Sequence, residues 1–103
     1  MTRIEQAAAM AAQKWKVFEK DPLWVMQYLY WAEIFLMARD VFTGEQPLTF
    51  AIACGLHRPD TLPATVWCDG HAFLVDLGWA EPMQERLNGC KCWRSLIFTG
   101  ERK

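Results

Sequence analysis

Residues 22–42 are apolar on almost every side of a helical wheel, and no other feature constrains the fold of this chain as strongly. A helix of this kind must be covered on all sides, by its own chain or by a partner. Its most apolar window, residues 22–38, contains Gln27 and Glu33 and falls short of the about 20 apolar residues that span a membrane. The segment therefore predicts a buried helix and no membrane span.

A shorter helix is predicted directly before it. Thr2 and Glu5 have the spacing of a capping box, in which each side chain bonds the amide of the other residue. Asp21-Pro22 then suits the start of the longer helix, and Gly44 suits its end. We expect the two helices to form a helical hairpin over residues 2–43 with almost no loop. The inner stripe of the first helix is predicted to contain Ile4, Ala8, Ala11, Trp15 and Phe18.

In the second half of the chain the spacing of the apolar residues changes, and residues 47–99 are predicted to form a sheet region. Asp69-Gly70 lies between two apolar runs within residues 64–77, a pattern typical of a two-residue β-hairpin turn. Residues 81–88 predict a short helix closed by the glycine that follows. Residues 92–99 predict a final strand.

The expected fold class is α+β in a single domain of 103 residues. The N-terminal helical hairpin would pack on a small, mainly antiparallel sheet with a short C-terminal helix. Residues 48–54 leave one choice open, because this run is too short to separate a strand from a short helix. If it is helical, three helices and a hairpin indicate a winged-helix-like fold instead.

Two Cys-x-x-His pairs raise the question of a zinc site: Cys54 with His57, and Cys68 with His71. Recognised zinc sites usually carry Cys-x-x-Cys with a second matched pair, and cysteine is among the most buried residue types. We therefore expect no stoichiometric zinc and no other cofactor, and a zinc-stabilised interaction module is the third hypothesis. Because the sequence has no nucleophile elbow, phosphate loop or dinucleotide motif, we also expect no enzyme.

Charge is segregated along the chain, although its total is only −1 and excludes a strongly basic nucleic-acid binder. Residues 59–85 contain only acidic charges, and residues 86–103 contain almost only basic ones. We expect an acidic hairpin surface that docks on a basic partner, which argues against a wing that grips nucleic acid. The acidic residues predicted at this interface are Asp60, Asp69, Asp76 and Glu81, and the bases available to a nucleic-acid binder are Arg86, Lys91, Arg94, Arg102 and Lys103.

Aromatic residues are unusually frequent: the chain has six Trp, six Phe and two Tyr. A domain of this size has few fully enclosed places for so many large rings, and Trp and Tyr are favoured interface anchors. We predict that part of the long helix contacts a protein target or a second copy in a two-fold homodimer. The residues predicted for this contact are Trp24, Tyr28, Trp31 and Phe35.

Together these features favour a non-enzymatic protein that binds and modulates or inhibits another protein or a macromolecular complex. No export signal is recognisable in the sequence, which favours a cytoplasmic setting. Inhibitors of bacterial defence systems encoded by phages and mobile elements, such as the anti-CRISPR proteins, are one category of small proteins that this reading fits. Neither nucleic acid nor membrane is the expected partner. The alternative is a small winged-helix-like regulator that binds nucleic acid.

Overall fold

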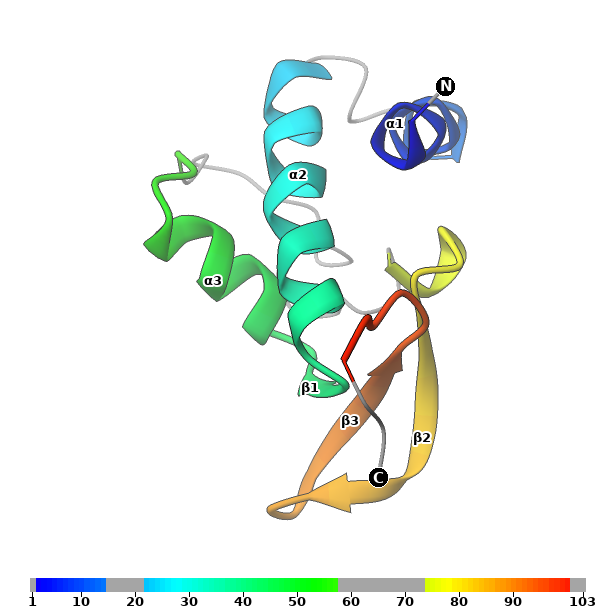
Figure 1. Cartoon of the computed structure of the whole chain (residues 1–103), viewed down its shortest axis with the longest axis vertical. Helices are drawn as coiled ribbons and strands as arrows, with labels where there is room; N and C mark the ends of the chain where they lie inside the picture. Colours follow the sequence, from blue (N-terminus) through cyan, green and yellow to red (C-terminus); the bar gives the residue numbers. More distant parts are fainter. Residues whose placement is uncertain (1, 15–21, 58–73, 101–103) are drawn as a thin grey trace.

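The computed structural model describes residues 2–14, 22–57 and 74–100, and these form helices and a small antiparallel sheet, an α+β arrangement (Figure 1). In Figure 1, α2 runs through the middle of the molecule, α3 lies to its left and the sheet lies below. The elements in chain order are α1 (Arg3–Lys14), α2 (Pro22–Ala38), β1 (Val41–Thr43), α3 (Gln46–Ala53), β2 (Ala80–Leu87) and β3 (Cys90–Ser95).

Helix α1 begins as the sequence predicts. The amide of Glu5 donates to the Thr2 hydroxyl at 3.1 Å, and the amide of Thr2 donates to the Glu5 carboxylate at 3.3 Å. This is the reciprocal pair of a capping box. Ala7 and Ala11 are buried where α1 packs against α2. The connection between the two helices, residues 15–21, lies outside the described residues, so the tight helical hairpin stays a prediction.

Helix α2 ends at Ala38, and the expected end near Phe42 is wrong, because residues 41–43 form β1. The last carbonyls of a helix lack partners within the helix and need others. Here they come from the far end of the chain: Ser95 Oγ donates to the Leu36 carbonyl at 2.6 Å, and the Thr99 amide and hydroxyl both donate to the Met37 carbonyl at 3.0 Å. Contacts distant in sequence therefore end α2, and Gly44 does not.

Residues 46–53 are helical, which decides between the two structures that the sequence left open. Pro47 lies in the first turn of α3, where its missing amide costs nothing. The side-chain oxygen of Gln46 accepts a hydrogen bond from the Thr43 amide at 3.1 Å and so links β1 to the start of α3. After α3 the chain turns at Gly55, whose φ of 109° favours glycine.

The sheet has the order β1-β3-β2, with both pairings antiparallel. Phe42 of β1 and Pro82 of β2 both lie opposite Trp93 of the central strand. Between Pro82 and Arg86 the register shifts, so β2 carries a bulge. The sheet is therefore small, with its longest strand, β2, at one edge.

The short helix expected over residues 81–88 is wrong, since this segment is the edge strand β2. The turn that joins β2 to β3 is Asn88-Gly89, with φ values of 53° and 81°. Positive φ at both positions is what a tight hairpin turn requires, and Asn-Gly supplies it readily. Pairing with β3 thus overrides the helical interpretation. The expected final strand over residues 92–99 is confirmed as far as Ser95, where β3 ends.

The hairpin expected at Asp69-Gly70 lies outside the described residues except for its end. That end is not a strand: residues 74–76 are helical and residues 77–78 form a turn. Leu74 is fully buried there, and its carbonyl accepts a hydrogen bond from the Trp79 amide at 3.0 Å. At Leu74, the apolar character therefore reflects burial in a helical turn.

The core is organised around α2, which contributes seven buried residues to it. A series of aromatic rings links four elements: Phe50 of α3 lies 5.5 Å from Phe35 of α2, Phe35 lies 5.9 Å from Phe42 of β1, and Phe42 lies 6.4 Å from Trp93 of β3, measured between ring centroids. Contacts of this kind add to the free energy of burial. Among the described residues, no helix combines the length and apolar character that crossing a membrane requires.

Candidate functional site

Two surface features of the described residues are candidate binding sites: the tip of the β2–β3 hairpin and an apolar groove over α2. The hairpin extends away from the helices at the lower end of the molecule (Figure 1). Its Asn88-Gly89 turn is exposed, so the tip is narrow and free of bulky side chains. A two-stranded ribbon of this shape can enter a groove of another molecule.

Arg86 and Lys91 lie directly opposite each other on the two strands, next to this turn, and both are exposed. Within the described residues, neither forms an ion pair; Arg86 donates to the Gly89 carbonyl at 3.3 Å, and the Lys91 ammonium lies 5.7 Å from the Trp93 ring centroid. Like charges directly opposite each other on a sheet are destabilising. Each cation has a contact within its own chain, and neither contact neutralises its positive charge, so the pair is available for contact with an anionic group.

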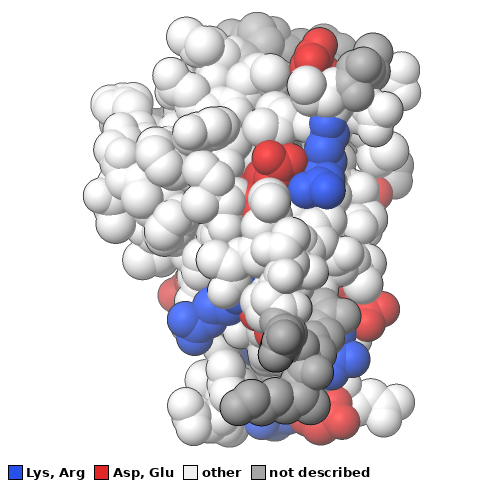
Figure 2. Space-filling model, viewed as in Figure 1, with Lys and Arg blue, Asp and Glu red and all other residues white. Residues whose placement is uncertain are grey.

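The local charge of the tip differs from that of the whole chain. Residues 86–91 contain two cations and no acidic residue, although the total charge is −1. Arg94, further along β3, lies 4.0 Å from the Asp40 carboxylate and is partly neutralised by it. Figure 2 shows the blue and red side chains mostly over the lower half of the molecule, while the upper left is almost uncharged.

One face of α2 is left open by the described chain. Leu23, Tyr30 and Ile34 are 67 %, 50 % and 36 % exposed, and with Gln27 they follow a 4-3-4 spacing along the helix. Residues at this spacing lie on one side of a helix. This open side is referred to below as the α2 stripe, defined as Leu23, Gln27, Tyr30 and Ile34.

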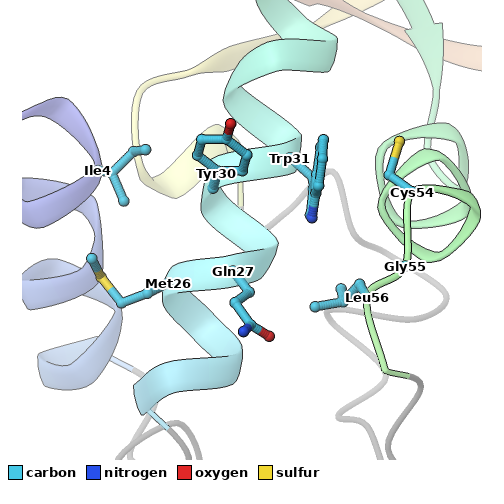
Figure 3. A pocket seen from close by; sticks show the side chains of 8 residues that line it. All are labelled: Ile4, Met26, Gln27, Tyr30, Trp31, Cys54, Gly55 and Leu56. Carbon is cyan, nitrogen blue, oxygen red and sulfur yellow. The ribbon is translucent and has the colours of Figure 1, made fainter.

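A cavity of about 480 Å³ opens on the α2 stripe, between α1 and the end of α3 (Figure 3). Its polar side-chain groups are the amide of Gln27, the hydroxyl of Tyr30, the indole N–H of Trp31 and the thiol of Cys54, and no charged side chain contributes to it. Such a lining holds no nucleophile–base pair and suits contact with an apolar surface. The lining residues are Ile4, Met26, Gln27, Tyr30, Trp31, Cys54, Gly55 and Leu56.

The aromatic residues predicted for an interface are mostly in the core. Trp24, Tyr28 and Phe35 are 7 %, 1 % and 9 % exposed, so of the four only Trp31, which lines the cavity, reaches the surface. Trp24 donates to the His57 carbonyl at 2.7 Å and stacks on Tyr28 with 5.6 Å between ring centroids. Burial raises the pKa of the Tyr28 phenol far above its ordinary value.

The predicted acidic surface is described only in part. Asp76 and Glu81 are exposed, but on different elements, and Asp60 and Asp69 lie outside the described residues. The same holds for Arg102 and Lys103 of the predicted basic set. The described chain therefore does not bring these residues together as one interface, and the acidic docking surface stays a prediction.

The residues considered for a zinc site are also described only in part. Cys54 and His57 are exposed, and Cys68 and His71 lie outside the described residues. In the part of the chain that the structure covers, no three His, Cys, Asp or Glu side chains gather closely enough to hold a metal ion. Cys92 is buried and its thiol donates to the Glu85 carbonyl at 3.1 Å, so it serves the bulged hairpin as a structural residue.

Sequence reasoning missed the hairpin tip, for which a signal existed, and it predicted an interface on the long helix without identifying the side of that helix that stays open. Asn88-Gly89 is as strong a hairpin signal as Asp69-Gly70, on which the predicted hairpin rests. It would have placed Arg86 and Lys91 beside a turn. The α2 stripe had no such signal in the sequence, because an all-apolar helix gives no indication of which side stays open. Comparisons with models of protein families, with curated proteins and with solved structures gave no match. The function must therefore be argued from the chain itself.

Proposed function

We propose that this chain is a small non-enzymatic, nucleic-acid-binding module of winged-helix type, in which the β2–β3 hairpin is the wing. The observation that carries the proposal is the order of the described elements α2, β1, α3, β2 and β3, combined with the sheet order β1-β3-β2; residues 58–73, between α3 and β2, lie outside the described residues. In a winged helix, a short strand after the first helix pairs with the last strand, and the last two strands form the wing. This likeness concerns the fold, and the binding function is argued from the charges at the hairpin tip.

The main objection to this function is the predicted acidic hairpin at Asp69-Gly70, whose turn lies outside the described residues. The sequence interpretation placed a turn at Asp69-Gly70 among acidic residues, which would repel phosphates. The hairpin that the structure describes spans β2 and β3, and Arg86 and Lys91 flank its turn. A wing with two unneutralised cations at its tip is attracted to a polyanion. The charge argument therefore favours nucleic acid at this position.

Arg86 and Lys91, which lie opposite each other on the two strands, are suited to phosphate contacts. An arginine or lysine that neutralises a phosphate releases a counterion, so the binding constant falls as salt rises. Such contacts position a protein on the duplex without reading its sequence. The Asn88-Gly89 turn between the cations presents little side-chain bulk and lets the backbone approach closely. We therefore assign Arg86 and Lys91 to phosphate contacts.

The test measures binding of a fluorescent duplex DNA by anisotropy over a series of salt concentrations. We expect binding that weakens with salt, and in the double variant Arg86→Ala/Lys91→Ala we expect the slope of log K against log salt to decrease by about 2, one for each lost phosphate contact. Arg39→Ala removes one positive charge just after α2, outside the hairpin, and is the control that should leave the slope unchanged. A wild-type chain that does not bind duplex DNA, or a double variant with an unchanged slope, contradicts the proposal.

A second function, the binding of a protein, is supported by a different surface. The α2 stripe and the lining of the cavity on it contain no charged side chain and are mostly apolar, and exposed apolar patches are found at protein contacts. The expectation of an inhibitor that acts on another protein or complex stays a prediction, and its surface would be this groove rather than the buried rings of Trp24, Tyr28 and Phe35. Its test is whether charge placed on the stripe abolishes a protein contact while the fold is retained.

A further inference from the structure

From the Asn88-Gly89 turn we infer a modification site: Asn88 deamidates spontaneously, and the carboxylate that results lowers the positive charge of the hairpin tip. Asn88 and Gly89 are both exposed and lie at the end of the β2–β3 ribbon (Figure 1). Asn88 is the only asparagine of the chain. The modification itself needs no partner, whereas its effect on binding rests on the proposed function.

The reaction is an attack of the Gly89 backbone nitrogen on the side-chain amide carbon of Asn88. The new C–N bond closes a five-membered succinimide. The bond from the amide carbon to the side-chain nitrogen breaks, and this nitrogen leaves as ammonia with the proton that the backbone amide gives up. Water then opens the ring at either carbonyl carbon, which yields aspartate or isoaspartate. Overall, one water is consumed and one ammonia is released, and nothing is oxidised or reduced.

The residue after the asparagine leaves room for this attack. A side chain at that position crowds the attacking nitrogen, and glycine has none. A Cβ built at Gly89 would meet no atom within 4 Å, so the described chain leaves the turn open to water on this side. The tip of an exposed ribbon also opens at a smaller cost in free energy than the core. Rotation at Asn88 that brings the two reacting atoms together therefore does not require unfolding of the core.

The cations on either side of the turn favour the reaction. The Gly89 nitrogen attacks after it loses its proton, so negative charge develops first on the backbone and then on the side-chain oxygen of the tetrahedral intermediate. Arg86 and Lys91 lie next to the turn on the two strands, and neither forms an ion pair within the described residues. Arg86 donates to the Gly89 carbonyl at 3.3 Å, which holds this cation at the residue that supplies the nucleophile. Positive charge close to a group favours its anionic form.

The products change what the tip can bind. A carboxylate at position 88 lowers the net charge of residues 86–91 from two positive charges to one. A modification that changes charge acts through the same electrostatic contacts as the original side chains, here those of Arg86 and Lys91 with phosphate. Isoaspartate also adds one carbon to the main chain, so the two residues no longer form a two-residue turn. Under the proposed function, deamidation therefore limits the time for which the wing binds nucleic acid.

Mass spectrometry of the purified full-length chain, incubated without nucleic acid at neutral and mildly alkaline pH, tests the modification. Trypsin cleaves after Arg86 and Lys91 and releases the peptide 87–91, whose mass shows the exchange of amide for carboxylate. We expect the product to accumulate with time and about tenfold faster per pH unit, because the ionised fraction of the backbone amide rises in this ratio. Isomerisation at Asp69-Gly70 leaves the mass of the chain unchanged and does not interfere.

Two variants give the controls for the reaction. Asn88→Gly has no side-chain amide and adopts a positive φ readily, so it should keep the turn and show no change of mass in this peptide. The double variant Arg86→Ala/Lys91→Ala, followed by the mass of the intact chain, should deamidate more slowly than the wild type because the two cations are missing. A wild-type peptide 87–91 that keeps its mass, or a double variant that reacts as fast as the wild type, would overturn the inference.

Asn88→Asp carries the charge of the product on an unaltered main chain and tests the effect on binding. With the fluorescent duplex used above, we expect its slope of log K against log salt to be about 1 smaller than that of the wild type, and Asn88→Gly to bind like the wild type. An Asn88→Asp variant with the wild-type slope also contradicts the inference. A wild-type chain that binds no duplex while its peptide 87–91 still changes mass contradicts the proposed function and supports the modification site, so the two failures are distinguishable.

Discussion

The hydroxyl of Ser95 at the end of β3 donates a hydrogen bond of 2.6 Å to the carbonyl of Leu36 in the last turn of α2. Ser95 is completely buried, and its hydroxyl also accepts from the Ile97 amide at 3.3 Å. The Ser95 amide in turn donates to the Asp40 carbonyl at 2.7 Å. One residue therefore joins the sheet to the helix that organises the core.

Ser95→Ala should lower the free energy of unfolding by about 1–3 kcal/mol, because it leaves the Leu36 carbonyl buried without this donor. Thr99→Ala is the matched control and should cost less than about 1 kcal/mol, since Thr99 is exposed and its amide still donates to the Met37 carbonyl. Urea unfolding of the three proteins measures the difference. Equal stability of the two variants would show that the buried bond contributes no more than the exposed one.

Gly89→Ala should destabilise the hairpin by about 1–2 kcal/mol, because φ is 81° at this position and a side chain makes that conformation unfavourable. A Cβ at Gly89 would meet no atom within 4 Å, so the cost comes from the backbone alone. Asn88→Gly is the control: φ is also positive there, and glycine adopts it readily. Thermal unfolding of both variants tests the turn, and a Gly89→Ala variant as stable as the wild type would contradict its geometry.

Tyr28 should make the fold sensitive to alkali. Its burial raises the pKa of the phenol above the value near 10 expected in the unfolded chain, so unfolding releases a proton above that pH. The contribution of Tyr28 to stability is complete below pH 10 and is lost as pH rises further, by about 1.4 kcal/mol per pH unit. Tyr28→Phe, which keeps a ring to stack on Trp24, should lose less stability than the wild type above pH 10. Parallel pH dependences of the two proteins in urea unfolding would rule out this role.

Ala11→Leu should cost about 1–3 kcal/mol, because Ala11 is fully buried where α1 packs against α2 and a larger side chain would separate the helices. Ala9→Leu places the same side chain on the exposed side of α1 and should be nearly neutral. Chemical unfolding compares the two. If both are tolerated, α1 is not closely packed.

Local signals in the sequence were reliable where local interactions determine the structure. The Thr2–Glu5 capping box needs only four residues, and a proline in the first turn of α2 and of α3 acts through its own ring. The end of α2 was not predictable, because it depends on Ser95 and Thr99. The charged strand β2 resembles a helix by composition, and only its pairing with β3 makes it a strand.

The candidate sites were predictable to a smaller degree. Tyr30 and Trp24 belong to the same apolar helix, and an all-round apolar pattern does not say that Tyr30 is exposed and Trp24 buried. That difference depends on where α1 and α3 pack against α2, and the sequence of α2 alone does not contain this information. The basic pair at Arg86 and Lys91 was present in the sequence, but its meaning depended on recognising the Asn88-Gly89 turn between them.

The bulge and the proline in β2 have a consequence for how this chain can aggregate. β2 lies at the edge of the described sheet, where exposed amides and carbonyls would invite the edge strand of another molecule and, by repetition, a fibre. Pro82 lacks an amide hydrogen, and the register shift between Pro82 and Arg86 distorts the ladder that an incoming strand would extend. Growth of the sheet from molecule to molecule through β2 is therefore disfavoured, and this edge is protected from amyloid-like polymerisation.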